Sequence, residues 1–207
     1  MTMYSQTDRG IKLGKEDILY VIPYLNPWNW MNMDSIKETD EIIDVLIQMY
    51  GTNLNIISTG MSMGGLCSLV YPYYSRHHVV GVVSNCPVCD LPYHYTERPD
   101  LPRTLYSAYY KDDESSEELA DVLKKFSPLH LAIQQVLPKI DYTIFHCECD
   151  HAVNIDMHSV KFINEMNKYH SVNFIKVPNK DHCDLGEYFN EYDNIIIQYN
   201  LNCYLLL

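Results

Sequence analysis

The sequence predicts an α/β fold in which a mostly parallel sheet is covered by helices on both faces. Short apolar runs alternate along the chain with longer segments whose apolar residues recur at helical spacing. This alternation is typical of parallel strands that are joined by crossover helices. A chain of 207 residues is long enough for one well-buried core. We therefore expect a single domain over residues 1–207.

The first expected strand covers residues 18–23, an apolar run that ends in proline. A helix should follow it, because Ser35 and Glu38 form a capping box and Gly51 supplies a stop signal. The apolar residues of this helix recur at helical spacing and are Ile36, Ile43, Leu46, Ile47 and Tyr50. A second short strand contains Ile56 and Ile57. An apolar helix over residues 66–74 comes after it, and Pro72 is expected to end or kink that helix.

The third and fourth strands are predicted over residues 79–84 and 142–147. The long insertion between them, about residues 85–128, is a candidate lid over a site. Within it we expect an ordered loop and then a helix, over residues 85–103 and 116–126. The remaining predicted elements are an amphipathic helix, a fifth strand and a closing helix, over residues 156–169, 172–177 and 185–199.

A serine between glycines lies at the junction of the second strand and the helix that follows it, in the sequence STGMSMGGL. A sharp turn at such a junction requires nearly side-chain-free neighbours, and Gly60, Gly64 and Gly65 meet that requirement. The pattern favours Ser62 as a nucleophile that is exposed at the carboxyl edge of the sheet. The alternative is a plain glycine turn without chemistry.

A serine hydroxyl needs a histidine to accept its proton and a carboxylate to hold that histidine in the right tautomer. In sheets of this type the order along the chain is serine, acid, histidine, each after its own strand. Asp150 follows the fourth strand and His182 follows the fifth. Glu148 and Asp156 are weaker candidates, because the former falls within the strand and the latter at a helix start. Two further histidines flank the acid, for which a structural role is expected: His146 and His151.

These motifs resemble those of the α/β-hydrolase superfamily, and within it the prolyl-oligopeptidase-type and small bacterial serine esterase branch. The resemblance is carried by TGMSMGGL, by FSPLH, by HCECDHAVN as a variant of HGxxDxxVP, and by KDHCDL, over about residues 54–185. It implies a catalytic triad of Ser62, Asp150 and His182 that forms and hydrolyses an acyl-enzyme. Cys147 and Asn154 stand where that pattern usually has glycine and proline.

Members of this superfamily usually have three strands before the first strand-helix pair, and the loop after the third donates a backbone N–H to the oxyanion hole. Only some seventeen residues precede Ile18, so we expect the first three strands to be missing. One oxyanion donor is expected from the backbone of Met63, at a helix start. The other is expected from Tyr24 or Leu25. Missing strands would expose a sheet edge, so we expect a homodimer that covers it.

The expected activity is cleavage of a carboxylic ester. Aromatic side chains suit flat acyl groups or sugar rings, which indicates acetyl or feruloyl esters of carbohydrates as a substrate class. A peptidase of the prolyl-oligopeptidase type and a catalytically impaired binding protein with this fold are the alternatives. Packing of the lid is an equally good explanation of the aromatic residues. The candidate substrate-binding residues are Trp28, Trp30, Tyr93, His94 and Tyr106.

Composition excludes some partners and favours others. The formal net charge of −12 leaves no basic face for phosphates, so no nucleic acid is expected as a partner. The expected partner is a small-molecule ester or a short peptide.

No apolar run is long enough to span a membrane, and no signal-peptide pattern is present, so a cytoplasmic protein is expected. No cofactor and no metal are expected. A zinc site could be assembled from Cys86/Cys89 and Cys147/Cys149, with His146, His151, His182 and Cys183 nearby. It is disfavoured because the Cys-x-Cys pair lies at the end of an expected strand, where alternate residues share a face for packing reasons alone.

Overall fold

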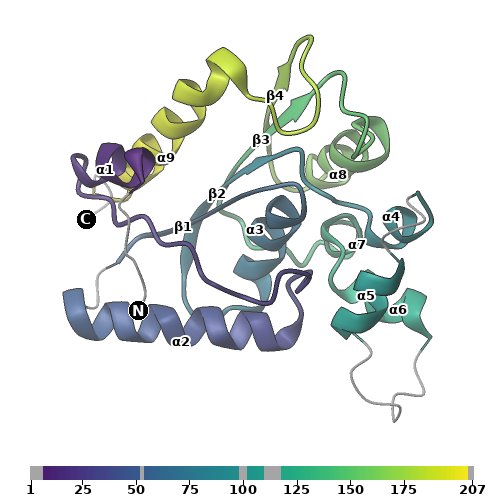
Figure 1. Ribbon diagram of the computed structural model, residues 1–207, viewed down its shortest axis with the longest axis horizontal. Coiled ribbons are helices and arrows are strands. Elements are labelled where there is room, and N and C mark those ends of the chain that lie inside the picture. The colour runs from purple at the N-terminus through teal and green to yellow at the C-terminus, as the bar shows by residue number, and fades with distance from the viewer. Residues whose placement is uncertain (1–6, 52–53, 98–101, 110–117, 205–207) are drawn as a thin grey trace.

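A four-stranded parallel sheet forms the centre of the protein, with strand order β1-β2-β3-β4. In this computed structural model the residues described are 7–51, 54–97, 102–109 and 118–204. The predicted α/β architecture is confirmed, because helices cover the sheet on both sides (Figure 1). The strands are β1 (Ile56–Met61), β2 (Val79–Asn85), β3 (Asp141–Cys147) and β4 (Asn173–Val177).

Two hydrophobic cores lie on the two faces of the sheet. Val82 and Ile144 belong to the larger core, whereas their chain neighbours Val83 and Phe145 belong to the smaller one. This alternation follows from the strand geometry, in which successive side chains point to opposite faces. Helices pack against both faces, and α3 and α9 lie on opposite sides of the sheet in Figure 1. The larger core includes residues of α2 (Met33–Tyr50), α3 (Met63–Tyr74), α8 (Lys161–Met166) and the helices of the insertion between β2 and β3, whereas the helix of the smaller core is α9 (Phe189–Tyr204).

Helix α1 (Asp8–Gly14) was not expected from the sequence. The side chain of Thr7 caps it by accepting a hydrogen bond from the N–H of Gly10. Arg9 and Lys12 of α1 lie 3.0 Å and 2.9 Å from the carboxylate of Asp193 in α9, which is fully buried. These ion pairs dock the start of the chain on the helix at its end.

The other helices differ from expectation mainly at their ends. Helix α2 begins at Met33 and not at Ser35, because Asn32 is the N-cap and accepts from the Ser35 N–H. Gly51, with φ of 107°, ends this helix as predicted. The helix expected over residues 66–74 is confirmed as α3, which begins earlier, at Met63, and continues past Pro72 to Tyr74, so this proline does not end it. A kink at Pro72 stays a prediction.

The insertion between β2 and β3 carries four helices within its described residues, joined by short loops. The loop expected over residues 85–103 is confirmed for residues 86–90 and is wrong for residues 91–97 and 102–103, which are helical. The predicted helix over residues 116–126 is confirmed as α6 in its described part, and residues 116–117 lie outside the described residues. The helix expected over 156–169 opens with one π-helical turn, η1 (Asp156–Val160). The closing helix is preceded by a 3₁₀ turn, η2 (Gly186–Tyr188). The helices of the insertion are α4 (Leu91–Glu97), α5 (Pro102–Tyr109), α6 (Leu119–Lys125) and α7 (Pro128–Ile133).

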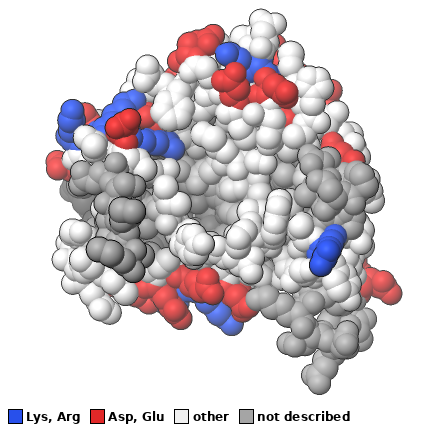
Figure 2. All heavy atoms as spheres, viewed as in Figure 1, with Lys and Arg blue, Asp and Glu red and all other residues white. Residues whose placement is uncertain are grey.

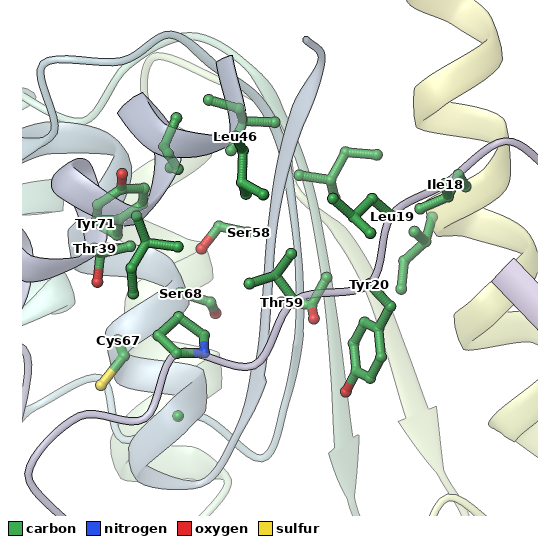
Figure 3. A pocket seen from close by; sticks show the side chains of 18 of the residues that line it. Ile18, Leu19, Tyr20, Thr39, Leu46, Ser58, Thr59, Cys67, Ser68 and Tyr71 are labelled. Atoms are coloured by element: carbon green, nitrogen blue, oxygen red, sulfur yellow. The ribbon is translucent and has the colours of Figure 1, made fainter. Parts of the chain in front are cut away.

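The strand predicted at residues 18–23 is wrong. Residues 18–26 form no strand or helix, and a cavity of about 780 Å³ separates this segment from β1 (Figure 3). Leu19 and Tyr20 line one wall of the cavity and Thr59 of β1 lines another, while α2 and α3 contribute Leu46 and Tyr71. An apolar run becomes a strand only when an adjacent strand accepts its backbone hydrogen bonds. Here a cavity, and not a strand, lies next to the run.

The face shown in Figure 2 carries charged side chains mainly around its rim, whereas uncharged residues occupy its middle. Acidic residues outnumber basic ones, 27 to 15, in the whole chain. Among the described helices, none is both long and apolar enough to cross a membrane.

Candidate active site

Ser62 lies between β1 and α3 in a backbone conformation that side chains rarely adopt, with φ of 56° and ψ of −121°. Its N–H donates to the carbonyl of Asn85 at 3.0 Å, which ties the turn to the neighbouring strand. A Cβ atom on Gly60 would collide with the carbonyl oxygen of Gly64, and one on Gly65 would lie 2.7 Å from the Ser84 hydroxyl. The turn therefore requires glycine at positions 60 and 65. At Gly64 the expected requirement is wrong, because an added Cβ would meet nothing within 4 Å.

The structure brings the three residues predicted as a triad together, with the histidine within hydrogen-bond distance of both the serine and the aspartate. The Oγ of Ser62 is 2.9 Å from Nε2 of His182, and Nδ1 of His182 is 2.8 Å from Oδ2 of Asp150. Each residue follows a different strand, β1, β3 or β4, and parallel strands bring their carboxyl ends to one edge of the sheet. The order of strands along the chain thus places a hydroxyl, an imidazole and a carboxylate in line.

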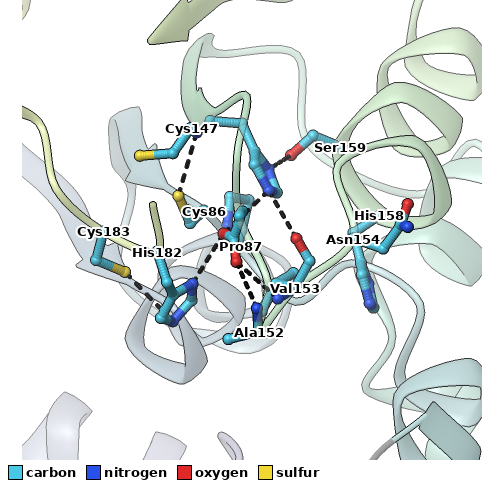
Figure 4. A network of polar contacts seen from close by, with 12 residues as sticks. Cys86, Pro87, Cys147, Ala152, Val153, Asn154, His158, Ser159, His182 and Cys183 are labelled. Carbon is cyan, nitrogen blue, oxygen red and sulfur yellow. Dashed lines mark hydrogen bonds and ion pairs between the residues drawn. The ribbon is translucent and has the colours of Figure 1, made fainter. Parts of the chain in front are cut away.

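The carboxylate of Asp150 is fully buried and accepts hydrogen bonds from several directions; the donors His182, Ala152 and Val153 are labelled in Figure 4. Burial alone would raise the pKa of Asp150, but hydrogen bonds from His146 and His182 and from the N–H groups of Val153 and Ala152 hold it well below its usual range. The group is therefore an ionised acceptor. Nδ1 of His182 must carry a proton to donate to it, which leaves the lone pair of Nε2 facing the serine hydroxyl.

His182 is the base of this arrangement. Its hydrogen bond to Asp150, and a second one with Cys86, raise the pKa of His182 to about 9 against the opposing effect of burial. Its side chain is 27% exposed, so water and substrate can reach the ring. The imidazole is thus a stronger base than a free histidine.

His146 supports the acid from behind, a contact that the sequence did not reveal. Its Nε2 lies 3.0 Å from the carbonyl of Val153 and 3.3 Å from Oδ2 of Asp150, and its Nδ1 lies 2.7 Å from the hydroxyl of Ser159. Since both groups near Nε2 are acceptors, Nε2 carries the proton and Nδ1 accepts from Ser159. The structural role expected for His146 thus includes the orientation of Asp150. His151 is exposed and contacts Asp181.

Two cysteines beside His182, Cys86 and Cys183, were considered from the sequence only for a disfavoured zinc site and not as neighbours of the triad. Cys183 Sγ lies 3.5 Å from Nε2 of His182, and Cys86 follows β2 at the same edge of the sheet. The hydrogen bond with Cys183 and burial raise the pKa of the Cys86 thiol. Their positions gave a signal, because one directly follows the predicted histidine and the other ends a predicted strand.

The expected oxyanion donors have different surroundings. Met63 is the first residue of α3, and the first N–H groups of a helix have no acceptor inside the helix. The side chain of Tyr24 is 98% exposed, and it lines a shallow hollow on the outer side of α2. Leu25 and Met63 line the same 780 Å³ cavity. The oxyanion roles of Met63, Tyr24 and Leu25 stay predictions.

The aromatic residues proposed for substrate binding divide into two groups. Trp30 and His94 are only 2% and 3% exposed and pack against each other with ring centroids 5.8 Å apart, which favours a packing role for both. Trp28 and Tyr106 are 52% and 49% exposed, and Tyr93 is partly buried against the ring of His158. Substrate contact therefore stays a prediction, with more surface available at Trp28 and Tyr106.

Comparison with known proteins identifies the fold of the chain. No family model and no curated protein matches the chain. Solved structures do match it. A puromycin-hydrolysing peptidase of Mycobacterium tuberculosis matches over 83% of this chain, with a TM-score of 0.64 and 15% identity. An acylaminoacyl peptidase of Pyrococcus horikoshii covers 82% of it, with a TM-score of 0.59 and 15% identity. A truncated carbohydrate esterase from gut microbiota covers 81%, with a TM-score of 0.60 and 19% identity.

The chain has the α/β-hydrolase fold. The fold expected from the resemblance in sequence motifs is thus confirmed over most of the chain. The present α/β-hydrolase chain spans 25% and 26% of the lengths of the two peptidases and 67% of the length of the esterase.

Proposed function

We propose that the protein is a serine hydrolase that cleaves carboxylic esters through an acyl-enzyme intermediate. The observation that carries the proposal is the continuous hydrogen-bonded line from Ser62 through His182 to Asp150, with separations of 2.9 Å and 2.8 Å. Nucleophilic catalysis by serine requires such a line, because the hydroxyl proton must leave as the new bond forms.

In the first half of the reaction Ser62 Oγ attacks the ester carbonyl carbon and its proton moves to Nε2 of His182. The buried carboxylate of Asp150 stabilises the imidazolium that results. The negative charge that develops on the carbonyl oxygen faces the N–H of Met63 at the start of α3, where the helix dipole favours an anion. Collapse of this intermediate expels the alcohol, which takes the proton from Nε2.

In the second half a water molecule gives its proton to Nε2 and attacks the acyl-enzyme carbonyl. The tetrahedral intermediate then collapses and releases the acid, and Ser62 Oγ takes the proton back from Nε2 of His182. The partial exposure of His182 supports this step, because water must reach the imidazole.

An ester of a carbohydrate is the preferred substrate class, with acetyl and feruloyl groups as the acyl part. It is supported by the match with a carbohydrate esterase and by the exposed aromatic side chains of Trp28 and Tyr106. Peptide substrates are the second candidate, favoured by the matches with peptidases. Initial rates on p-nitrophenyl acetate and methyl ferulate, compared with rates on aminoacyl p-nitroanilides, separate the two classes.

A fluorophosphonate probe tests the nucleophile directly. We expect stoichiometric covalent labelling of the wild-type protein and no labelling of Ser62→Ala, because the probe reacts only with an activated hydroxyl. Intact-mass spectrometry measures the added mass, and Ser107→Ala, at an exposed serine of α5, serves as a serine control that still labels. An unlabelled wild type would favour the alternative of a binding protein that keeps the fold without catalysis.

The pH dependence of kcat/KM tests the base. Only neutral His182 can accept a proton, and its pKa is raised to about 9. We therefore expect kcat/KM to rise with pH and to fall about tenfold per pH unit below that value. Initial rates on p-nitrophenyl acetate, corrected with Ser62→Ala at each pH, give the profile. A plateau that already begins near pH 6.5 would contradict the contact between His182 and Asp150.

A further inference from the structure

Two thiols and the catalytic imidazole meet at the edge of the sheet. Cys86 comes from the end of β2, whereas His182 and Cys183 come from the loop after β4 (Figure 4). One potential ligand atom from each of the three residues lies within 4.8 Å of the others. Cys86 is fully buried, and the other two residues are partly exposed. The cluster is thus enclosed on one side and accessible on the other.

The donor set and its spacing fit a tetrahedral metal ion. Two sulfurs and one imidazole nitrogen are ligands that Zn²⁺ prefers, with bonds of about 2.3 Å and 2.0 Å, which place S and N about 3.5 Å apart at the tetrahedral angle. The separation of Cys183 Sγ from His182 Nε2 is 3.5 Å. The backbone N–H of Cys147 also donates to Cys86 Sγ at 3.4 Å, an interaction that stabilises a thiolate.

The backbone is strained at both cysteines. Cys86 and Cys183 have φ values of 46° and 62°, in the left-handed region that residues other than glycine rarely occupy. Such strain persists only where the surrounding structure enforces it, and it is concentrated at functional sites. Neither cysteine gives or takes a proton in the proposed reaction, although Cys86 contacts His182, so the strain at these two positions is consistent with a further use.

A second group, formed by His94, Glu97 and His158, has comparable spacing but unsuitable chemistry. Nδ1 of His158 accepts from the N–H groups of Cys89 and Asp90, both at 3.1 Å. Its proton is therefore on Nε2, where it points to Glu97 at 3.2 Å. A ring nitrogen that carries a proton has no lone pair for a metal, so this group is a hydrogen-bonded link between the insertion and η1.

We propose that Cys86, His182 and Cys183 form a binding site for Zn²⁺ or another thiophilic divalent ion, and that the bound ion inhibits the enzyme. On binding, the two thiols release their protons to solvent, and Nε2 of His182 donates its lone pair to the ion. Water or the Ser62 hydroxyl occupies the fourth position. The serine proton then has no acceptor, so the ester is not attacked. The inhibition rests on the proposed function, whereas the binding of the ion does not.

Cobalt titration tests the site without reference to activity. Co²⁺ added to the reduced, full-length protein should give thiolate-to-cobalt charge-transfer absorption and the visible bands of tetrahedral cobalt, saturating at one equivalent and displaced by Zn²⁺. The bands should be lost in Cys183→Ser and in Cys86→Ser and kept in Cys149→Ser, an exposed cysteine outside the cluster. Thermal melting identifies any variant that does not fold, and Cys183, being partly exposed, is the safer substitution. Absence of the bands in the wild type, or their survival in folded Cys183→Ser, would overturn the proposal.

Zinc inhibition tests the consequence. Even outer-shell partners change metal affinity about 10–100-fold, so the loss of a direct ligand in Cys183→Ser should raise the Zn²⁺ concentration for half-inhibition at least tenfold. Zn²⁺ should also slow fluorophosphonate labelling of Ser62, and a chelator should restore it. Equal sensitivity of the wild type and Cys183→Ser would show that the ion acts elsewhere. Cobalt bands in a protein that no probe labels would refute the hydrolase and leave the metal site standing.

Discussion

Replacing His182 with alanine should lower kcat about 10⁶-fold, because the serine loses its only positioned proton acceptor. The imidazole lies 2.9 Å from Ser62 Oγ and 2.8 Å from the Asp150 carboxylate, so its removal breaks both contacts at once. KM should change little, since the ring contributes to proton transfer rather than to binding of the ground state. Steady-state kinetics on p-nitrophenyl acetate, with Ser62→Ala as the baseline, measure the effect.

His151→Ala is the matched control for this experiment. It removes a histidine near the same edge of the sheet, but one whose side chain is 82% exposed and contacts only Asp181 among the partners identified. Its kcat should stay within twofold of the wild type, as expected for a surface substitution. If His182→Ala kept activity above that of Ser62→Ala by orders of magnitude, another group would have to be the base.

Replacing Asp150 with asparagine should lower kcat about 10⁴-fold while the fold is kept. The amide oxygen can still accept from the N–H groups of Ala152 and Val153, which hold the Oδ1 position at 2.9 Å and 2.8 Å. The amide NH₂ would then face Nδ1 of His182, which must become an acceptor. The ring proton would therefore move to Nε2, where it faces the serine and prevents proton transfer.

Asp156→Asn is the control for the acid, because it makes the same chemical change at an exposed carboxylate after the same strand. We expect near wild-type kcat and melting temperature for this variant, whereas Asp150→Asn should melt at a lower temperature, because its amide NH₂ would face the protonated Nε2 of His146. Near-normal turnover of Asp150→Asn would mean that the geometry of Asp150 does not set the tautomer of His182.

The nucleophile turn could be predicted because its constraint is local. A strand that passes into a helix within one residue forces atoms of Gly60 and Gly65 against neighbouring backbone or side chains, and this requirement is visible as glycine in the sequence. Asp150 and His182 could be placed because parallel strands bring their ends together, so that order along the chain becomes proximity in space. Neither inference needed side-chain packing.

Features that depend on distant partners could not be predicted. Residues 18–23 have the composition of a strand but lack a neighbouring strand that would accept their hydrogen bonds. Trp30 and His94 are residue types that are common in binding sites, yet both are buried and pack against each other. The approach of Cys86 to Cys183 depends on how the loops after β2 and β4 pack together, and the spacing of the two residues in the sequence does not determine that packing.

The hollow beside β1 changes how the end of the sheet meets its surroundings. β1 is one of the two outer strands of the sheet within the described part of the chain, and such a strand normally invites another molecule to extend the sheet, which is a route to aggregation. Residues 18–26 form no strand and lie across the cavity from that edge. They act as a screen, because a colliding molecule meets an irregular segment before it reaches the row of amide groups. The homodimer expected to cover this edge stays a prediction.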